Sequence, residues 1–398
     1  MKKTLYNMLI CLVLIHIFTS CSKESDTIGK PSSYFVKVTQ SKDYSIEELK
    51  QTIGPHSAGE FLTGPAANFT LRVQIDAIHY RTKDPGGKPI TASGIISFPR
   101  SGNFKGVILA EHYTITDEKE APSEVMYSLE SIYSFMDYVV ITPDYIGLGE
   151  TKNLPHPYLH TESAGQVSID MLFAAREYME SMQKPIPKEI YIVGYSEGGA
   201  SALACQKITE QRYASEIPIK HVMAGGGPYD LVASCDHFIK QNESAYPCSI
   251  PLLVIGLNYG DNLQLDFTRI FHGKLLEDYP EWFGSKKYSS FKINKFMNTQ
   301  TISEFMHHDM FLPEMNPDFR KLYASFKKNS LVNWKPKNPL LLVHGKTDTY
   351  VPFLNAQTAY DSFKAKGCPV ELCTTEHGHL ATVPYFYYKV TEILLANK

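Results

Sequence analysis

The chain has 398 residues, of which 43% are hydrophobic and 20% are charged, a composition typical of a globular protein that buries a large core. Its formal net charge is −3 at pH 7, and the charged residues are spread along the sequence. This balance argues against nucleic acid as a partner, because nucleic-acid-binding domains usually carry a basic patch or stripe.

The first 21 residues read as a secretion signal of the bacterial lipoprotein type. A basic start, "MKK", precedes the apolar run "LYNMLICLVLIHIF", which is too short for a stable membrane span. The following "FTSC" predicts that Cys21 is lipidated and becomes the mature N-terminus. We therefore expect a lipid-anchored protein of the bacterial envelope at the outer membrane, and the acidic stretch "SKESD" favours the cell surface. The alternative is a plain secretory signal that is cleaved nearby.

Beyond a polar tether at residues 22–33, strand-like and helix-like segments alternate. The runs "LRVQIDAIHYRT" and "PITASGIISFP" flank the turn "KDPGGK" and predict a hairpin. Six further strand-like runs follow in chain order: "GVILAEHY", "YVVITPDY", "IYIVGYS", "HVMAGGG", "PLLLVHGKTD" and "VELCTT". Continuous apolar runs suit strands that are buried on both faces. The sequence therefore predicts an α/β fold with a mostly parallel, eight-stranded sheet flanked by helices.

One connection is far longer than the others. About a hundred residues separate the sixth and seventh predicted strands, where such loops usually have about 2–6. We expect residues 34–228 and 338–398 to form the core and residues 229–337 to form a helical cap over the carboxyl ends of the strands. The aromatic residues of the insert could form a substrate wall or the cap's own core; they are Trp282, Phe283, Phe291 and Phe296.

The segment "GYSEGG", residues 194–199, follows an apolar strand and precedes a helix start rich in small residues. A sharp strand-to-helix turn with glycines on both sides of a serine is the context of a nucleophile elbow. We therefore expect Ser196 to be a nucleophile at the carboxyl edge of the sheet. The alternative is a tight turn without chemistry.

A nucleophilic serine needs a base and an acid. Asp348 follows the seventh predicted strand, and two histidines follow the eighth. We prefer His377 as the base because it lies directly past the strand and before a glycine, which leaves His379 as a bystander or a helix-start residue. Asp348 could instead be a solvated or helix-capping residue.

The oxyanion formed in such chemistry needs preorganised N–H groups. We expect the backbone amide of Glu197 and that of either Tyr113 or Thr114, in the loop after the third strand, with His112 orienting this loop. The Glu197 side chain could line the substrate pocket or be solvated. Asp144, at the end of the fourth strand, is expected to brace loops.

Several of these segments together resemble the secretory lipase family of α/β-hydrolases. The similar motifs are "PDYIGLG", "HPYLHTESAGQVSIDMLFAAREY", "GYSEGG" and the two strand endings that carry Asp and His, within residues 70–398. That family carries its cap between the sixth and seventh strands. The resemblance implies an esterase or lipase with a catalytic triad of Ser196, Asp348 and His377. The chain departs from the family at residue 113, where Tyr113 replaces the glycine of a His-Gly-Thr-like stretch.

The expected function is hydrolysis of a small-molecule or lipid ester through an acyl-enzyme intermediate, without a cofactor or metal, and with membrane contact only through the N-terminal lipid. One rival is a serine aminopeptidase or dipeptidyl-peptidase-type hydrolase, whose ammonium site could use Glu277, Asp278 and Glu281. Another is a non-catalytic surface binding protein. Five cysteines follow Cys21, so they cannot all pair within one chain, and the state of Cys235 and Cys248 is left open.

Overall fold

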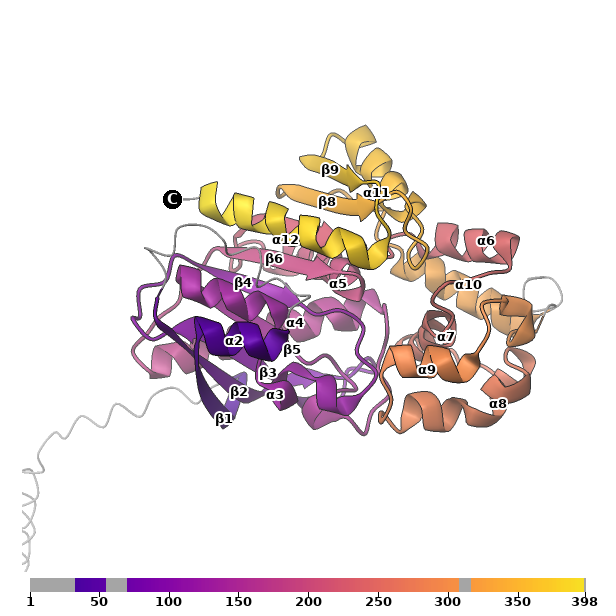
Figure 1. Cartoon of the computed structure of the whole chain (residues 1–398), viewed down its shortest axis with the longest axis horizontal. Coiled ribbons are helices and arrows are strands. Elements are labelled where there is room, and N and C mark those ends of the chain that lie inside the picture. Colours follow the sequence, from indigo (N-terminus) through magenta and orange to yellow (C-terminus); the bar gives the residue numbers. More distant parts are fainter. Residues whose placement is uncertain (1–32, 55–69, 308–315, 397–398) are drawn as a thin grey trace, which may run out of the picture. The chain divides into compact units, whose positions relative to one another are not determined.

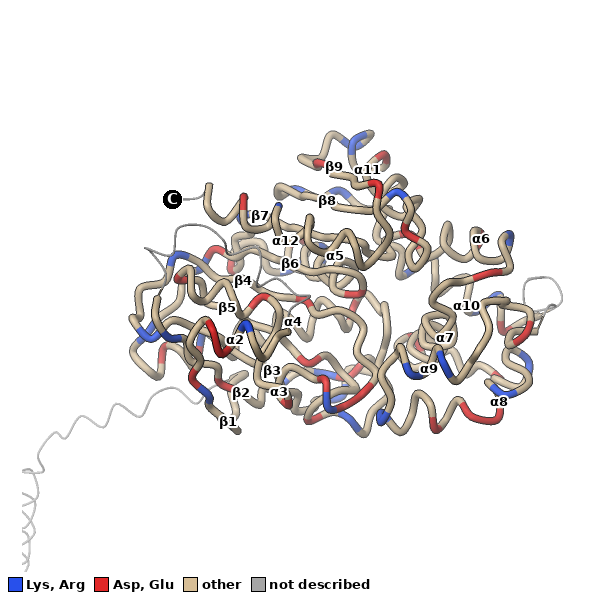
Figure 2. The backbone as a smooth tube through the Cα atoms, in the orientation of Figure 1, with Lys and Arg blue, Asp and Glu red and all other residues tan. Residues whose placement is uncertain are grey.

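The computed structural model describes residues 33–54, 70–307 and 316–396. The predicted signal sequence, with Cys21, and nearly all of the predicted tether lie outside these residues. The acidic and basic side chains of the described chain are interspersed rather than gathered by sign (Figure 2).

A single mixed sheet organises the described residues, with its strands in the order β1-β2-β3-β5-β4-β6-β7-β8-β9. The strands are β1 (Phe35–Ser45), β2 (Arg72–Lys83), β3 (Pro89–Pro99), β4 (Gly106–Glu111), β5 (Tyr138–Pro143), β6 (Ile190–Tyr195), β7 (Ile219–Gly225), β8 (Leu340–Gly345) and β9 (Val370–Thr375). The pairs β1–β2, β2–β3 and β3–β5 are antiparallel, and all other pairs are parallel. The predicted hairpin is β2–β3.

The sheet of the described chain has nine strands rather than the eight predicted, because β1 was missed. The sequence of β1, "FVKVTQSKDYS", is polar and mostly exposed. Among the described strands, this edge strand pairs only with β2, so it needs no continuous apolar run. With β1 counted, the long insert follows the seventh strand.

Helices cover both faces of the sheet (Figure 1). They are α2 (Ile46–Ile53), α3 (Pro122–Val125), α4 (Thr161–Ser181), α5 (Glu197–Ile208), α11 (Leu354–Ala365) and α12 (His379–Ala396), with short turns η3 (Glu118–Glu120), η4 (Leu129–Met136), η5 (Gly149–Thr151) and η6 (Thr209–Tyr213). Successive side chains of a strand point to opposite faces. In β4, Val107 and Leu109 join the hydrophobic cluster that includes α4, α5 and α11, whereas Ile108 and Ala110 join the cluster with α2, η4 and α12.

The insert between β7 and β8 is helical. Its elements are α6 (Leu231–Gln241), α7 (Ser249–Gly260), η7 (Phe267–Arg269), α8 (Gly273–Tyr279), η8 (Pro280–Gly284), α9 (Ser290–Met297), η9 (Ile302–Glu304) and α10 (Pro317–Asn329). These helices enclose a hydrophobic cluster of their own, to which Trp282 and Phe283 belong. Phe296 packs against this cluster, whereas Phe291 is half exposed and borders the cavity between core and cap. Three of the four aromatic residues therefore belong to the cap's core, and Phe291 fits the substrate-wall alternative.

Buried polar contacts fasten the cap to the core. Asp261 of the cap accepts hydrogen bonds from His160, which precedes α4, and from three cap residues: Ser325, Lys328 and Asn329. Lys286 donates to the carbonyl oxygens of Gly147 and Leu154 in the core. These contacts hold the cap beside the carboxyl ends of β6 and β8 (Figure 1).

Candidate active site

Ser196 lies in a strained turn between β6 and α5. Its backbone has φ 61° and ψ −123°, which a non-glycine residue adopts only where the surroundings hold it. The turn also requires the glycines on both sides. A Cβ atom on Gly194 would lie 2.1 Å from the Gly198 carbonyl oxygen, and one on Gly198 would lie 2.0 Å from that of Glu111. The sequence prediction of an elbow at Ser196 is therefore matched by the local geometry.

A chain of hydrogen bonds leads away from this serine. His379 Nε2 lies 2.9 Å from Ser196 Oγ, and His379 Nδ1 lies 2.6 Å from Asp348 Oδ2. Because a carboxylate only accepts hydrogen bonds, Nδ1 carries the proton, and Nε2 presents its lone pair to the serine hydroxyl. This is the arrangement in which an imidazole acts as a general base.

The prediction of His377 as the base is wrong in this geometry. The His377 side chain is exposed, and its backbone N–H donates to Thr375 Oγ1 at 3.3 Å. The chain turns for three residues after β9 before α12 begins, so the side chain that reaches Ser196 is that of the first helical residue, His379. The rings of Tyr195 and Tyr350 pack against His379, with centroid distances of 5.2 and 5.3 Å.

Asp348 is buried and well supplied with donors. Its Oδ1 accepts from the backbone N–H groups of Tyr350 and Val351, both at 2.9 Å. Burial by itself would raise its pKa, but hydrogen bonds from His344 and His379 outweigh that effect and hold the pKa at about 2. Asp348 is thus ionised across the physiological range.

Sequence reasoning missed His344, which is fully buried and four residues before Asp348. Its Nε2 lies 2.9 Å from the Val351 carbonyl oxygen and 3.3 Å from Asp348 Oδ2. The motif "HGKTD" contains this residue, but its spacing alone does not distinguish a histidine that braces the loop from one in the core.

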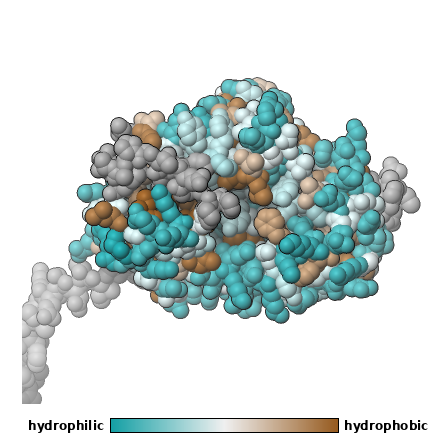
Figure 3. Space-filling model, in the orientation of Figure 1, coloured by the Kyte–Doolittle hydropathy of each residue, from teal (hydrophilic) through white to brown (hydrophobic). Residues whose placement is uncertain are grey.

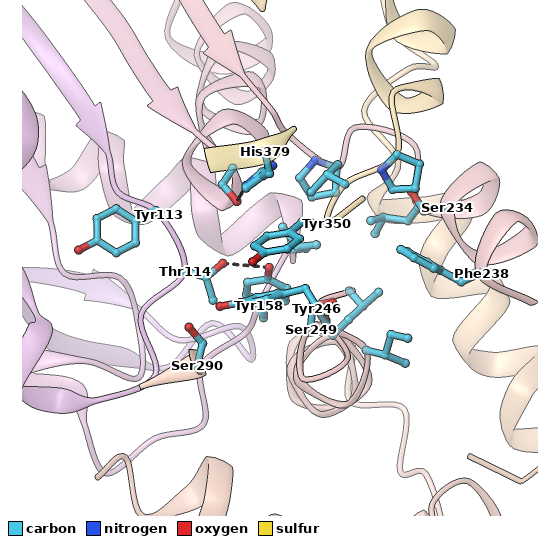
Figure 4. Close-up of a pocket in the computed structure, with 18 of the residues that line it drawn as sticks. Tyr113, Thr114, Tyr158, Ser234, Phe238, Tyr246, Ser249, Ser290, Tyr350 and His379 are labelled. Atoms are coloured by element: carbon cyan, nitrogen blue, oxygen red, sulfur yellow. Dashed lines mark hydrogen bonds between the residues drawn. The ribbon is translucent and has the colours of Figure 1, made fainter. Parts of the chain in front are cut away.

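The predicted oxyanion residues border the same cavity. Glu197 is the first residue of α5, so its amide is among the N–H groups that a helix N-terminus leaves without intrahelical partners. Tyr113 and Thr114 line the cavity with Ser196, and Thr114 Oγ1 lies 3.1 Å from the Tyr158 hydroxyl (Figure 4). The choice between the amides of Tyr113 and Thr114 stays a prediction.

His112 and Asp144 brace this region as expected. The ring nitrogens of His112 lie 2.6 Å from the Tyr113 carbonyl oxygen and 3.1 Å from the Asp144 carbonyl oxygen. The Asp144 carboxyl is fully buried and accepts hydrogen bonds from the Ser93 hydroxyl and from the hydroxyl and backbone N–H of Ser123. Burial raises the pKa of Asp144.

Both alternatives for the Glu197 side chain are wrong. It is 2% exposed and does not border the cavity. It points into the protein instead, where its Oε1 lies 2.7 Å from His156 Nε2. His156 is 41 residues away in the sequence, so no local pattern indicates this partnership.

Ser196 and His379 open onto a cavity of about 670 Å³ between core and cap. Hydrophobic residues surround this hollow in the space-filling view (Figure 3). Its apolar lining includes Leu129, Leu380 and Val383 from the core and Phe238, Leu253, Met306, Phe319, Leu322 and Phe326 from the cap. Hydroxyl groups interrupt this lining at Thr114, Tyr158, Ser234, Tyr246, Ser249, Ser290 and Tyr350 (Figure 4).

The described lining of this cavity contains a single carboxyl group, that of Glu111. Burial raises the Glu111 pKa to about 8, against the opposing effect of hydrogen bonds from Ser168 and Tyr145. The carboxylates that the aminopeptidase hypothesis requires, Glu277, Asp278 and Glu281, do not border the cavity. The site is therefore suited to an uncharged ligand.

The sheet, the elbow and the hydrogen-bonded Ser196, His379 and Asp348 together define an α/β-hydrolase fold with a hydrolase site. The family model for secretory lipases matches residues 124–385, which is more than half of the chain. The chain therefore belongs to the secretory lipase family and is a carboxylic ester hydrolase. The predicted fold class, family and enzyme class are confirmed. No curated protein sequence matches the chain.

Solved structures share this fold. A protein described as a hydrolase from Legionella pneumophila is 23% identical, covers 91% of this chain and 98% of its own, and has a TM-score of 0.78. The rice cell wall degrading esterase LipA from Xanthomonas oryzae is 23% identical, with 90% and 98% covered and a TM-score of 0.76. Candida antarctica lipase A in its closed state is 15% identical, with 87% and 79% covered and a TM-score of 0.62.

Three further features of the described residues bear on the sequence predictions. Cys235 and Cys248 are both free thiols. Histidine, cysteine and carboxylate side chains form no group of three or more that could hold a metal ion within residues 33–54, 70–307 and 316–396. In the same residues, every helix is too short or too polar to cross a membrane.

Proposed function

We propose that this protein hydrolyses carboxylic esters through a Ser196–His379–Asp348 triad and an acyl-enzyme intermediate. The observation that carries the proposal is the continuous hydrogen-bond chain from Ser196 Oγ through His379 to Asp348, at 2.9 and 2.6 Å. It begins at a serine that the elbow presents to a cavity.

In the proposed reaction, His379 Nε2 takes the hydroxyl proton while Ser196 Oγ attacks the ester carbonyl. The negative charge that forms on the carbonyl oxygen faces the amide of Glu197 and that of Tyr113 or Thr114. His379 then gives its proton to the leaving alcohol. A water molecule then gives a proton to His379 Nε2 and attacks the acyl carbonyl. His379 returns this proton to Ser196 Oγ as the bond to the serine breaks and the carboxylic acid leaves. Asp348 holds the imidazole tautomer and stabilises the imidazolium.

The substrate is proposed to be a small-molecule or lipid ester without charge near the scissile bond. The apolar cavity supports this class, since a charged group would lose its hydration there without finding an ionic partner. We further propose that the enzyme is anchored in the bacterial envelope through a lipid on Cys21, because the N-terminal sequence has the lipoprotein pattern.

The test is hydrolysis of p-nitrophenyl esters with acyl chains from C2 to C16 by the wild type and Ser196→Ala. Ser249→Ala is the matched control. This serine lines the same cavity, but its hydroxyl donates to the Tyr246 carbonyl oxygen and not to His379. Ser196→Ala should lower kcat by about 10⁵-fold or more. It should also abolish labelling by a fluorophosphonate probe, whereas Ser249→Ala should still be labelled. Equal activity of wild type and Ser196→Ala would refute the proposal, and failure of the wild type to be labelled would favour a binding protein.

A further inference from the structure

The residue directly after the proposed nucleophile carries a buried carboxylate that the mechanism above does not use. Glu197 is 2% exposed, and its Oε1 lies 2.7 Å from His156 Nε2. His156 belongs to the segment between η5 and α4, far from Glu197 in the sequence. The two side chains therefore join the first turn of α5 to a loop of the core.

The hydrogen-bond partners of His156 fix the number of protons in this pair. His156 Nδ1 lies 2.7 Å from the Ile146 carbonyl oxygen, which only accepts, so Nδ1 carries a proton. The contact between Nε2 and the Glu197 carboxyl needs one further proton, on either the imidazole or the carboxyl. In the first case the pair is an imidazolium and a carboxylate, and in the second both groups are neutral. The pair as a whole is uncharged in both forms.

The packing holds His156 in place for this contact. Gly147 has φ 95°, and a Cβ atom there would lie 2.6 Å from the His156 Cα atom. The Tyr145 ring lies parallel to the His156 ring within 2°, at a centroid distance of 6.1 Å. Tyr145 also stacks on His112 at a centroid distance of 3.9 Å, and its hydroxyl donates to Glu111 Oε2 at 3.0 Å. Tyr158 lies at a centroid distance of 5.8 Å from His156. The buried Lys286 of the cap approaches the same loop, where its ammonium donates to the carbonyl oxygens of Gly147 and Leu154.

The second carboxyl oxygen, Glu197 Oε2, is buried without a hydrogen-bond partner among the described residues. Without His156, the Glu197 carboxylate would thus lose its observed side-chain partner and become an unpaired buried negative charge. This charge would lie on the same residue whose amide is proposed to face the developing oxyanion. In a low-dielectric interior it would oppose the negative charge of the oxyanion and favour the protonated form of His379.

We propose that His156 is a positioning residue which, paired with Glu197, holds the oxyanion amide of residue 197 and keeps the net charge behind Ser196 at zero. This inference rests on the proposed function, because it takes Ser196 as the nucleophile and the residue-197 amide as an oxyanion donor. It assigns a role in the reaction to two residues that do not touch the substrate.

The test is a double-mutant cycle of His156→Gln and Glu197→Gln, with kcat and the pH profile of kcat/KM as readouts. In Glu197→Gln the new amide donates to His156 Nε2 and the pair stays uncharged, so kcat should fall only about three- to fivefold. In His156→Gln no imidazole remains to balance the charge of an ionised Glu197 carboxylate. Its kcat should fall about 100-fold, and the acidic limb of the profile should move to higher pH by roughly half a unit to one unit.

The double variant His156→Gln, Glu197→Gln carries no charge, so we expect kcat to return to within about twofold of Glu197→Gln and the acidic limb to return to its wild-type position. A merely structural role of the histidine would not produce this rescue. The inference is overturned if the double variant is as slow as His156→Gln, or if Glu197→Gln loses as much as His156→Gln. If His156→Gln does not fold, an active double variant supports the inference and an inactive one overturns it.

Ser196→Ala, made without the other substitutions, distinguishes failure of the proposed function from failure of the role proposed for His156. If Ser196→Ala keeps its activity, the proposed function fails. If it is inactive and the cycle shows no rescue, the proposed function stands and only the role of His156 fails.

Discussion

Glu111→Gln should change the pH dependence of stability in a direction that the structure specifies. The Glu111 carboxyl is 1% exposed, at the end of β4, and its Oε2 accepts from the hydroxyls of Ser168 and Tyr145. Burial raises its pKa from the ordinary 4.5 to about 8, and the charges of Glu130 and Glu197 add to the increase. The folded protein therefore holds a proton on Glu111 at pH values where the unfolded chain has released it.

The sign and size of the effect follow from this difference. Between pH 4.5 and pH 8 the folded state binds more protons than the unfolded state, so the free energy of unfolding falls as the pH rises. The decrease is about 1.4 kcal/mol per pH unit, which amounts to at most roughly 5 kcal/mol over the whole window. Glutamine resembles the protonated acid and does not titrate, so Glu111→Gln lacks this slope.

Urea unfolding at pH values from 5 to 9 measures the effect. Near pH 5 the wild type and Glu111→Gln should differ by less than about 1.5 kcal/mol, and near pH 9 the variant should be more stable by several kcal/mol. Titrations that are not coupled to Glu111 are common to both proteins and cancel in the difference. Glu277→Gln, at an exposed position, should run parallel to the wild type. A constant difference between wild type and Glu111→Gln across this pH range would refute the reasoning.

Two further predictions concern the site directly. His379→Ala should lower kcat on p-nitrophenyl esters by about 10⁵- to 10⁶-fold, while His377→Ala should stay within about twofold of the wild type, and the reverse order of these two variants would exclude His379 as the base. Gly198→Ala should cost about 1–3 kcal/mol in thermal unfolding and at least about tenfold in kcat, because its Cβ would meet the Glu111 carbonyl oxygen at 2.0 Å. Gly284→Ala has open space around the added methyl and should change neither quantity, so equal losses in both glycine variants would contradict the steric argument.

Local sequence patterns were sufficient for the features that short segments of chain determine. A buried parallel strand must be apolar on both faces, so β4 to β8 stand out as continuous hydrophobic runs. The elbow needs glycines next to Ser196 for steric reasons, and these are visible as a motif. The long insert identified the cap because parallel neighbouring strands do not otherwise require so many residues between them. Asp348 was predicted as the acid because it directly follows a strand downstream of Ser196, in the chain order that α/β-hydrolases use.

The features that the sequence could not determine depend on where a helix begins or on contacts between residues far apart in the chain. The choice between His377 and His379 depends on where α12 begins, and patterns locate helix ends only to within a few residues. The edge strand β1 is polar because β2 pairs with just one of its edges and most of its side chains stay exposed to solvent. The contact of Glu197 with His156 joins residues that come together only when α5 packs beside the loop before α4. The sequence by itself thus determined the class of fold and the position of the proposed nucleophile. The proposed base and the partner of Glu197 were decided by tertiary packing, which alone brings such distant side chains within hydrogen-bond distance.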